Sequence, residues 1–554
     1  MQVKRVVISL IVLLIVSFAN AQLLSSEDKF TKADTLRGSN NENRDWWDVL
    51  RYDIKVKPDF KNKTIEGVCE IAFTVIKEGN LLQIDLQDSL QIDSVTTLVP
   101  TYPQHKGRVF LPFVKKDGVY LITSTRTYVG NKKIIRIYYH GKPKEAIKPP
   151  WDGGWVWAKD SLGNPWMSVA CQGLGASSWF PCKDIQSDEP DSGATLTNIA
   201  PDSLTAIGNG RLNKSIGIAT TWQVKNPINN YDIVPYIGKY TNFTDTLIGE
   251  GGKLDLSYWV LSYNLEKAKR QFTQVKPMLR CFEYWFGKYP FYEDSYKLVE
   301  APYLGMEHQS AVAYGNGYQN GYRGTDLSKS GWGLKWDFII VHESGHEWFG
   351  NSITSKDLAD MWIHESFTMY SEVLYTQWMF GKEAANDYCV GLRHNIQNDK
   401  PIIGPYGVNK EGSGDMYYKG ANMLHTIRHI INNDILFREM LRGLNTTFYH
   451  QTVSTKQIED YLITKSGFDL HPIFNQYLTT VSIPHLKVEV NEKQGIATLR
   501  WTNCMDSFNM PITIPITSKC LNINTKNKII NLTKEELNWL TKENLERYYY
   551  IEVE

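Results

Sequence analysis

Residues 341–365, VHESGHEWFGNSITSKDLADMWIHE, constrain the fold of this chain more than any other stretch. His342 and His346 are four positions apart, so on a helix both imidazoles lie on one face, one turn apart. Eighteen residues separate His346 from Glu365, which lies in ADMWIHESFTMYSEVLYTQW, a segment with the apolar spacing of a helix. The stretch therefore predicts two antiparallel helices, joined by a loop over residues 350–358, that bring Glu365 back to the histidines.

His342, His346 and Glu365 form a set of ligands that suits a catalytic zinc ion, with the fourth position left open to water. Glu343 follows the first histidine, so we expect it beside that water. A carboxylate there accepts a proton from the water and returns it later to a leaving amine. The alternative for the pair is two helix histidines whose hydrogen bonds are satisfied by neighbouring groups.

A second histidine pair serves as an internal control. His425 and His429, in HTIRH, have the same spacing but lack the glutamate and a downstream helix with a carboxylate. We interpret this second pair as structural or as part of the surface.

The motif HESGHEWFGN, followed by the glutamate of DMWIHESF, resembles the gluzincin zinc aminopeptidases, the family of aminopeptidase N and leukotriene hydrolase. The usual form in that family is HExxHxWFGN followed by WLNEGF. The resemblance implies one zinc ion and removal of the first residue from peptides that have a free N-terminus. It covers nearly the whole chain after the N-terminal leader.

The element Leu304-Gly305-Met306-Glu307-His308 resembles the GAMEN element of the family. The resemblance implies an edge strand whose backbone, at Gly305 and Met306, holds the peptide, and it implies that Glu307 binds the α-ammonium. A buried carboxylate is the natural partner for an ammonium that loses its water on binding. This sequence departs from the family pattern in replacing the alanine and in carrying His308 at the final asparagine.

Three further positions follow from the resemblance. Gln172, in CQGLGASSWFPCKD, matches a family residue that faces the amino terminus of the substrate; the alternative is a loop amide bonded to the backbone. Tyr417, in YYKG, matches a tyrosine that donates to the oxyanion, although a shift of one residue would exchange it with Tyr418, and either could be a packing aromatic. Asp360 matches an aspartate that could hydrogen-bond a ligating imidazole, or it could favour a helix N-terminus through its charge.

The order of sequence patterns predicts a multidomain α+β fold. Residues 22–44 are polar and are predicted to form a mobile leader, and residues 45–250 alternate apolar and polar side chains as a β-rich domain does. Helical patterns dominate residues 251–482, and the family resemblance implies that they form a thermolysin-like catalytic domain. Strand patterns return in residues 483–554, which resemble the small β-sandwich that follows the catalytic domain in many family members.

The first 21 residues have the pattern of a secretory signal peptide. Lys4 and Arg5 precede an apolar run, and Ala19-Asn20-Ala21 is typical of a cleavage site. The alternative, an N-terminal membrane anchor, is disfavoured because the run is short for a bilayer. We therefore expect an exported protein, periplasmic or secreted, without stable membrane insertion.

Charge and cysteine content limit the kinds of partner and metal site that this chain can have. Sixty basic and sixty acidic residues give no net charge, and no basic patch indicates nucleic-acid binding. Seven cysteines without a CxxC pair argue against a cysteine zinc site; Cys504 and Cys520 could pair, but the sequence does not decide it. The oligomeric state is not predictable.

The sequence thus predicts a zinc-dependent aminopeptidase. One alternative is an endopeptidase resembling thermolysin, which would have no use for a glutamate that binds an ammonium. Another is a catalytically inactive peptide-binding protein, which the complete set of catalytic residue types disfavours.

Overall fold

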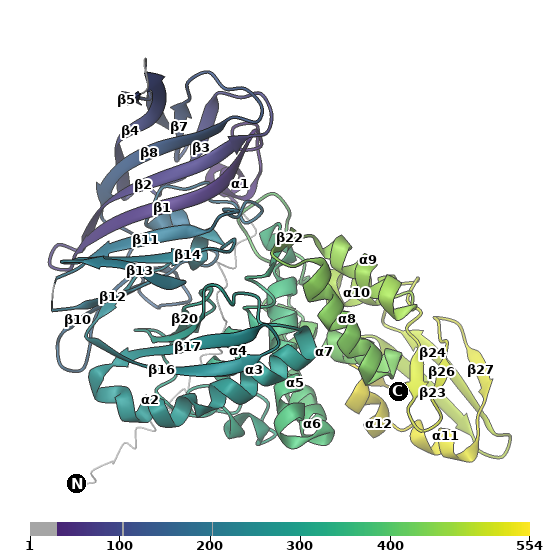
Figure 1. Ribbon diagram of the computed structural model, residues 1–554. Coiled ribbons are helices and arrows are strands. Elements are labelled where there is room, and N and C mark those ends of the chain that lie inside the picture. The colour runs from purple at the N-terminus through teal and green to yellow at the C-terminus, as the bar shows by residue number, and fades with distance from the viewer. Residues whose placement is uncertain (1–29, 102–104, 202) are drawn as a thin grey trace, which may run out of the picture.

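A computed structural model describes residues 30–101, 105–201 and 203–554 (Figure 1). The chain passes through a β-rich N-terminal part, a mainly helical middle part and a small C-terminal part, which confirms the predicted multidomain α+β organisation. The predicted signal peptide and residues 22–29 lie outside the described residues. In the part of the chain that is described, no helix is both long and apolar enough to cross a bilayer.

The N-terminal part is built around one large twisted sheet, because its strands place apolar side chains on alternate positions. In β1 (Trp47–Asp59), for example, Trp47, Val49, Tyr52 and Ile54 are buried. The order of the sheet is β13-β14-β11-β1-β2-β8-β4-β5. The other strands of this sheet are β2 (Thr64–Val75), β4 (Leu90–Thr101), β5 (His105–Phe110), β8 (Lys132–Gly141), β11 (Ala194–Ile199), β13 (Arg211–Ile216) and β14 (Ala219–Val224).

Two smaller sheets complete this part. The first has the order β12-β15-β10-β9, with β9 (Gly154–Lys159), β10 (Pro165–Ala170), β12 (Thr205–Ile207) and β15 (Tyr236–Gly238). The second has the order β3-β7-β6, with β3 (Leu81–Ile84), β6 (Phe113–Lys116) and β7 (Val119–Thr123).

The middle part begins with a hairpin, β16 (Tyr240–Gly249) and β17 (Gly252–Leu261). The expected boundary at residues 250/251 falls inside this hairpin. β17 pairs in parallel with β18 (Tyr296–Glu300), so both hairpin strands belong to the sheet of the middle part. The order of that sheet is β16-β17-β18-β20-β19, with β20 (Val312–Tyr314) and, at its edge, β19 (Gly305–Met306).

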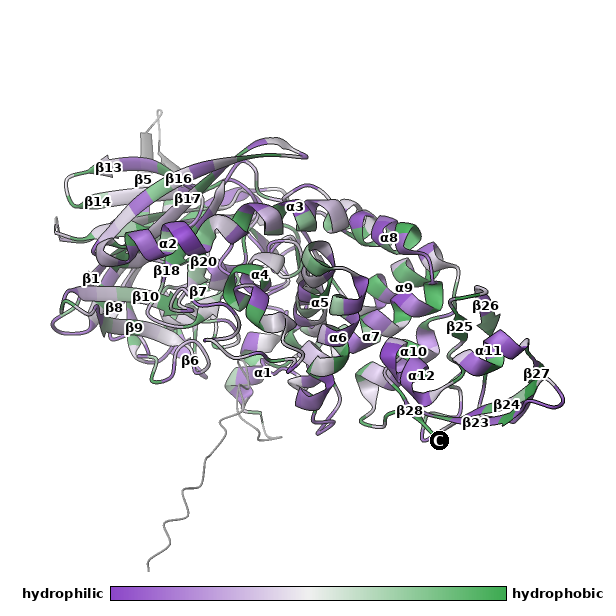
Figure 2. Cartoon of the chain, turned by 90° about the horizontal axis from the view of Figure 1, so that it is seen from below, coloured by the Kyte–Doolittle hydropathy of each residue, from purple (hydrophilic) through white to green (hydrophobic). Residues whose placement is uncertain are grey.

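The rest of the middle part is mainly helical. Helices α3, α8 and α9 are amphipathic, with hydrophobic and hydrophilic residues on different faces (Figure 2). A short parallel pair, β21 (Ile353–Ser355) and β22 (Gln451–Val453), lies among them. The helices are α2 (Leu265–Gln271), α3 (Val275–Phe286), α4 (Phe338–Gly345), α5 (Trp362–Phe380), α6 (Lys382–Leu392), α7 (Asp415–Ile431), α8 (Asp434–Thr447), α9 (Thr455–Ser466) and α10 (His471–Thr479).

Helices α4 and α5 pack against each other and form the centre of this part, as their sequence predicts. Asp337 starts α4, since its carboxylate accepts hydrogen bonds from the backbone N–H groups of Ile339 and Ile340. Helix α5 is buried on all sides from Trp362 to Thr376, so it forms the core of this part instead of covering a surface.

The C-terminal part contains helices that the sequence analysis did not predict. Its sheets have the orders β27-β24-β23-β28 and β25-β26. Thr533 caps α11 and forms a capping box with Glu536, while Thr541 caps α12, and these caps explain why the two segments are helical. The elements are β23 (His485–Asn491), β24 (Ile496–Thr502), β25 (Ile512–Ile514), β26 (Lys519–Leu521), β27 (Lys528–Asn531), α11 (Lys534–Trp539), α12 (Lys542–Tyr548) and β28 (Glu552–Val553).

Residues 30–44 differ from the predicted mobile leader. They contain helix α1 (Lys32–Gly38), capped by Thr31 and Asp34, and they pack against the N-terminal part. Arg44 is fully buried and forms an ion pair with Asp85. Polar side chains in this segment, whose abundance suggested mobility, form hydrogen bonds and ion pairs with other parts of the protein.

All seven cysteines lie in the described residues, and each is a free thiol. Cys504 and Cys520 are therefore not paired.

Candidate active site

Residues of helices α4, α5 and α7 and of β19, together with residues of several loops, line a cleft. It brings together residues that are far apart in the sequence. Of the predicted site residues, the cleft is lined by Gln172, Gly305, Glu307, His342, Glu343, His346, Glu365 and Tyr417.

The predicted metal ligands converge on one point. Glu365 Oε2 lies 3.7 Å from His342 Nε2 and 3.4 Å from His346 Nε2. Glu365 Oε2 is buried and has no hydrogen-bond partner among the described residues. A buried carboxylate oxygen without a partner is costly, so this arrangement fits a bound cation. Two imidazoles and one carboxylate form a donor set that suits zinc.

The other ring nitrogen of each histidine is held by an oxygen atom. His342 Nδ1 lies 2.6 Å from Glu372 Oε1, and Tyr388 donates its hydroxyl to the other oxygen of Glu372. His346 Nδ1 donates to the carbonyl oxygen of Phe349 at 3.0 Å. Both Nε2 atoms are thereby left with lone pairs that face Glu365.

Glu372, and not Asp360, forms the hydrogen bond to a ligating imidazole that the sequence suggested for Asp360. Asp360 instead accepts hydrogen bonds from Thr455 Oγ1 at 2.6 Å and from the Tyr406 hydroxyl at 2.7 Å. It precedes α5 and ties that end of the helix to α9, and it bonds neither ligating imidazole. Glu372 follows Glu365 by seven residues, which is two helical turns, so the face that it shares with the ligand was a signal in the sequence.

Glu343 lies beside the metal ligands without belonging to the set of three. One of its carboxylate oxygens lies within 4.8 Å of ligand atoms of His346 and Glu307. Burial raises the pKa of Glu343 to about 7. Gly305 packs directly on it, because a Cβ atom at position 305 would stand 2.6 Å from Glu343 Oε1. The glycine that replaces the alanine of the family element therefore permits this close approach.

A second cluster lies around Glu307, whose side chain is almost completely buried. Gln172 Nε2 donates to Glu307 Oε1, and the Tyr231 hydroxyl donates to the same oxygen at 3.1 Å. Gln172 is therefore a neighbour of Glu307 and not a loop amide bonded only to backbone. Tyr231 was missed because it stands in a stretch without a recognisable motif.

Tyr417, not Tyr418, faces the metal ligands. Its ring lies 6.1 Å from the ring of His342. Burial, together with the charge of Glu365, raises the pKa of Tyr417 well above its ordinary value. Tyr418 also lines the cleft, but burial and the charge of Glu372, not that of Glu365, raise the pKa of its phenol.

Three other histidines that the sequence singled out, His308, His425 and His429, are structural. His308 Nδ1 lies 2.7 Å from the hydroxyl of Tyr236, and burial lowers the pKa of His308 to about 3, so the ring stays neutral. His425 and His429 are buried within α7, and His425 Nδ1 lies 3.2 Å from the hydroxyl of Tyr370. The control pair is therefore internal, not part of the surface, and no third ligand joins it among the described residues.

Glu411 is a further acidic residue that no motif indicated. It is buried. Burial raises the pKa of Glu411 to about 8. It lies in the loop before α7, whose residues Ser413 and Gly414 line the cleft.

Two family models match the chain. Residues 49–226 match the peptidase M1 N-terminal domain, and residues 263–477 match the peptidase family M1 domain.

The chain is 21% identical over 474 residues to Probable aminopeptidase 2 of Sulfurisphaera tokodaii, covering 80% of this chain and 55% of that protein. It is 23% identical over 367 residues to Aminopeptidase B of Mus musculus, covering 60% of this chain and 52% of that protein. The chain thus spans about half the length of these curated relatives.

A solved structure has the same fold. It is a mutant M1 zinc metallopeptidase from Deinococcus radiodurans bound to the substrate Tyr-Ser-Ala, with a TM-score of 0.63 and 19% sequence identity. The alignment covers 79% of this chain and 95% of that one. With both of its family domains matched and the fold shared, the chain belongs to peptidase family M1.

Proposed function

We propose that the protein is a zinc-dependent aminopeptidase. The observation that carries this proposal is the presence, in one cleft, of a ligand set for a cation and a separate buried carboxylate at Glu307. The similarity to proteins named as aminopeptidases and to a solved zinc metallopeptidase supports it.

His342, His346 and Glu365 would hold the zinc ion through Nε2, Nε2 and Oε2. When bound, zinc polarises the scissile carbonyl and acidifies water. Glu343 receives a proton from the attacking water and passes it to the leaving amine. A carboxylate whose pKa lies near neutrality can do both, since it neither holds nor releases the proton too strongly.

Tyr417 donates its phenol proton in a hydrogen bond to the oxygen on which negative charge develops. Burial raises the pKa of Tyr417, which favours the protonated phenol and therefore a hydrogen-bond donor. A donor aimed at the developing charge stabilises the transition state more than the bound substrate.

Glu307 and Gln172 bind the free α-ammonium, and the Tyr231 hydroxyl orients Glu307. The backbone of β19, at the edge of its sheet, holds the peptide in an extended form. Because the ammonium is held at a fixed place relative to the metal ligands, only the first peptide bond reaches the catalytic groups. An endopeptidase would have no use for this arrangement.

A comparison of free and N-acetylated peptides tests the proposal. The native protein should release the first residue of a free tripeptide, should lose this activity on chelation and should regain it with zinc. The acetylated tripeptide, which has no charge to pair with Glu307, should not be cut. Cleavage of both peptides would indicate an endopeptidase, and no cleavage by the zinc-loaded protein would indicate a binding protein.

We also propose that the protein is exported and acts in the periplasm or outside the cell. Lys4 and Arg5, the apolar run and the Ala19-Asn20-Ala21 site support this. N-terminal sequencing of protein recovered from its own host should begin near Gln22. A product that retains residues 1–21 would contradict the proposal.

A further inference from the structure

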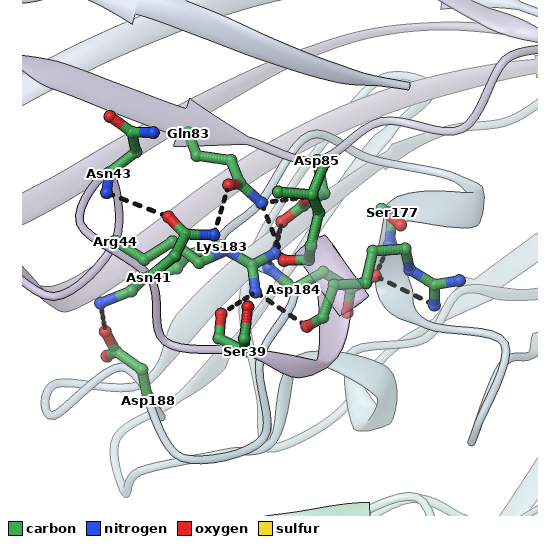
Figure 3. A network of polar contacts seen from close by, with 12 residues as sticks. Ser39, Asn41, Asn43, Arg44, Gln83, Asp85, Ser177, Lys183, Asp184 and Asp188 are labelled. Atoms are coloured by element: carbon green, nitrogen blue, oxygen red, sulfur yellow. Dashed lines mark hydrogen bonds and ion pairs between the residues drawn. The ribbon is translucent and has the colours of Figure 1, made fainter. Parts of the chain in front are cut away.

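The N-terminal clamp, defined here as residues 31–44, lies against the loop that carries Gln172. Its base is fixed by a buried polar network (Figure 3). Arg44 pairs with Asp85 and donates to the carbonyl oxygens of Arg37 and Ser39 at 2.8 and 3.2 Å. Gln83 Nε2 donates to the carbonyl oxygen of Leu36 at 3.1 Å. The clamp is therefore held firmly from its C-terminal end.

Arg37 connects the clamp to the loop immediately after Gln172. Its Nη2 atom donates to the carbonyl oxygen of Leu174 and lies 3.8 Å from Asp184 Oδ2. Asp184 in turn accepts from the backbone N–H groups of Ala176 and Ser177 at 3.2 and 3.1 Å. One guanidinium thus joins both sides of the loop that runs from Gln172 to Asp184.

Asn409 also holds this loop. Its Nδ2 atom donates to the carbonyl oxygen of Gly173 at 2.9 Å, and its backbone N–H donates to the carbonyl oxygen of Asp34 at 3.0 Å. Gly38 allows this contact, because a Cβ atom there would stand 2.1 Å from the carbonyl carbon of Val408. The clamp, the loop of Gln172 and the loop before α7 therefore meet at one place.

We propose that Arg37 and Asn409 are positioning residues for recognition of the substrate amine. They hold the carbonyl groups of Leu174 and Gly173, the two residues that follow Gln172, while the Gln172 amide itself bonds Glu307. Through these contacts the clamp sets where the Gln172 amide meets the ammonium. The inference rests on the proposed aminopeptidase function only for its kinetic consequence.

The kinetic test compares Arg37→Ala with a matched control, Arg51→Ala. Arg51 has the same kinds of contact in the same part of the protein, since it donates to the carbonyl oxygen of Ser192 at 2.6 Å and pairs with Asp53 at 3.0 Å. Both of these partners lie outside the loop from Gln172 to Asp184. Arg37→Ala should lower kcat/KM for a free tripeptide by ~10-fold, the size expected from one hydrogen bond to a charged group, mainly through KM. Arg51→Ala should leave both constants unchanged.

A double-mutant cycle separates positioning from general damage. If Arg37 acts through Gln172, adding Arg37→Ala to a protein that already carries Gln172→Ala should lower kcat/KM only slightly further. Asn409→Ala should behave in the same way as Arg37→Ala. The proposal would be overturned if the fold-losses in kcat/KM of the single variants simply multiply when either substitution is combined with Gln172→Ala.

Hydrogen exchange tests the inference without using catalysis. In the full-length protein, Arg37→Ala should speed amide exchange in residues 173–178, whereas Arg51→Ala should not. Unchanged exchange, or faster exchange in both variants, would overturn the positioning role whether or not the protein is a peptidase. Faster exchange at residues 173–178 in a protein that cleaves no peptide would support the clamp while contradicting the proposed function.

Discussion

Glu372 shows how a single buried side chain completes the candidate metal site. Its carboxylate lies 2.6 Å from His342 Nδ1, so it fixes which ring nitrogen carries the proton and which one faces the metal. Glu372→Ala should weaken zinc affinity by ~10–100-fold, the usual cost of losing such a partner.

Asp360→Asn is the matched control, because Asp360 bonds Thr455 and Tyr406 instead of a histidine. It should change thermal stability but not zinc affinity. Titration against a chelator of known affinity measures both variants. Equal zinc affinities for Glu372→Ala and the native protein would contradict the assignment.

Tyr417 and Tyr418 are adjacent in the sequence but differ in their surroundings. The ring of Tyr417 lies 6.1 Å from that of His342, and the charge of Glu365 helps to raise the pKa of its phenol, whereas for Tyr418 the carboxylate that raises the pKa is Glu372. Tyr417→Phe should therefore lower kcat by ~10²–10³ with little change in KM, as expected for the loss of one oxyanion donor.

Tyr418→Phe should leave kcat within a few-fold of the native value. Steady-state kinetics on one free peptide compares the two variants directly. A large loss for Tyr418→Phe and not for Tyr417→Phe would mean that the donor is the second tyrosine.

At the scale of elements, the residues that the sequence placed correctly are those whose positions depend on local geometry. The spacing of His342 and His346 on α4, and the helical pattern around Glu365 on α5, were sufficient because a helix determines which side chains share a face. The short strand at Gly305 and Met306 was also expected, although from a family resemblance and not from its own pattern.

What could not be predicted depends on contacts between distant elements. Tyr231 reaches Glu307 across 76 positions of sequence, and Arg37 reaches Leu174 across 137. No local period indicates such pairs. The polar composition of residues 30–44 favoured a mobile segment because composition counts polar groups but does not show whether the fold supplies partners for them.

At the scale of the whole molecule, the three parts share their cores. Buried residues from the sheet of the middle part, including Val299, Met306 and Ala313, lie in the hydrophobic core of the N-terminal part. Trp501 and Tyr549 of the C-terminal part belong to the same core as α4 and α5. We therefore expect the chain to unfold as one cooperative unit instead of as three separate domains.

Metal binding tests this coupling. A ligand that binds only the folded protein stabilises it by about 4.1 kcal/mol when its free concentration is 1,000 times its Kd. Zinc should therefore raise the unfolding temperature of every part that unfolds together with the site. Calorimetry of the full-length protein should show one transition, at a higher temperature with zinc than after chelation. Hydrogen exchange in β2, which lies in the N-terminal part away from the ligands, should also slow when zinc is added under mildly destabilising conditions. A second transition that does not move with zinc, together with unchanged exchange in β2, would show that the N-terminal part unfolds independently despite the shared core.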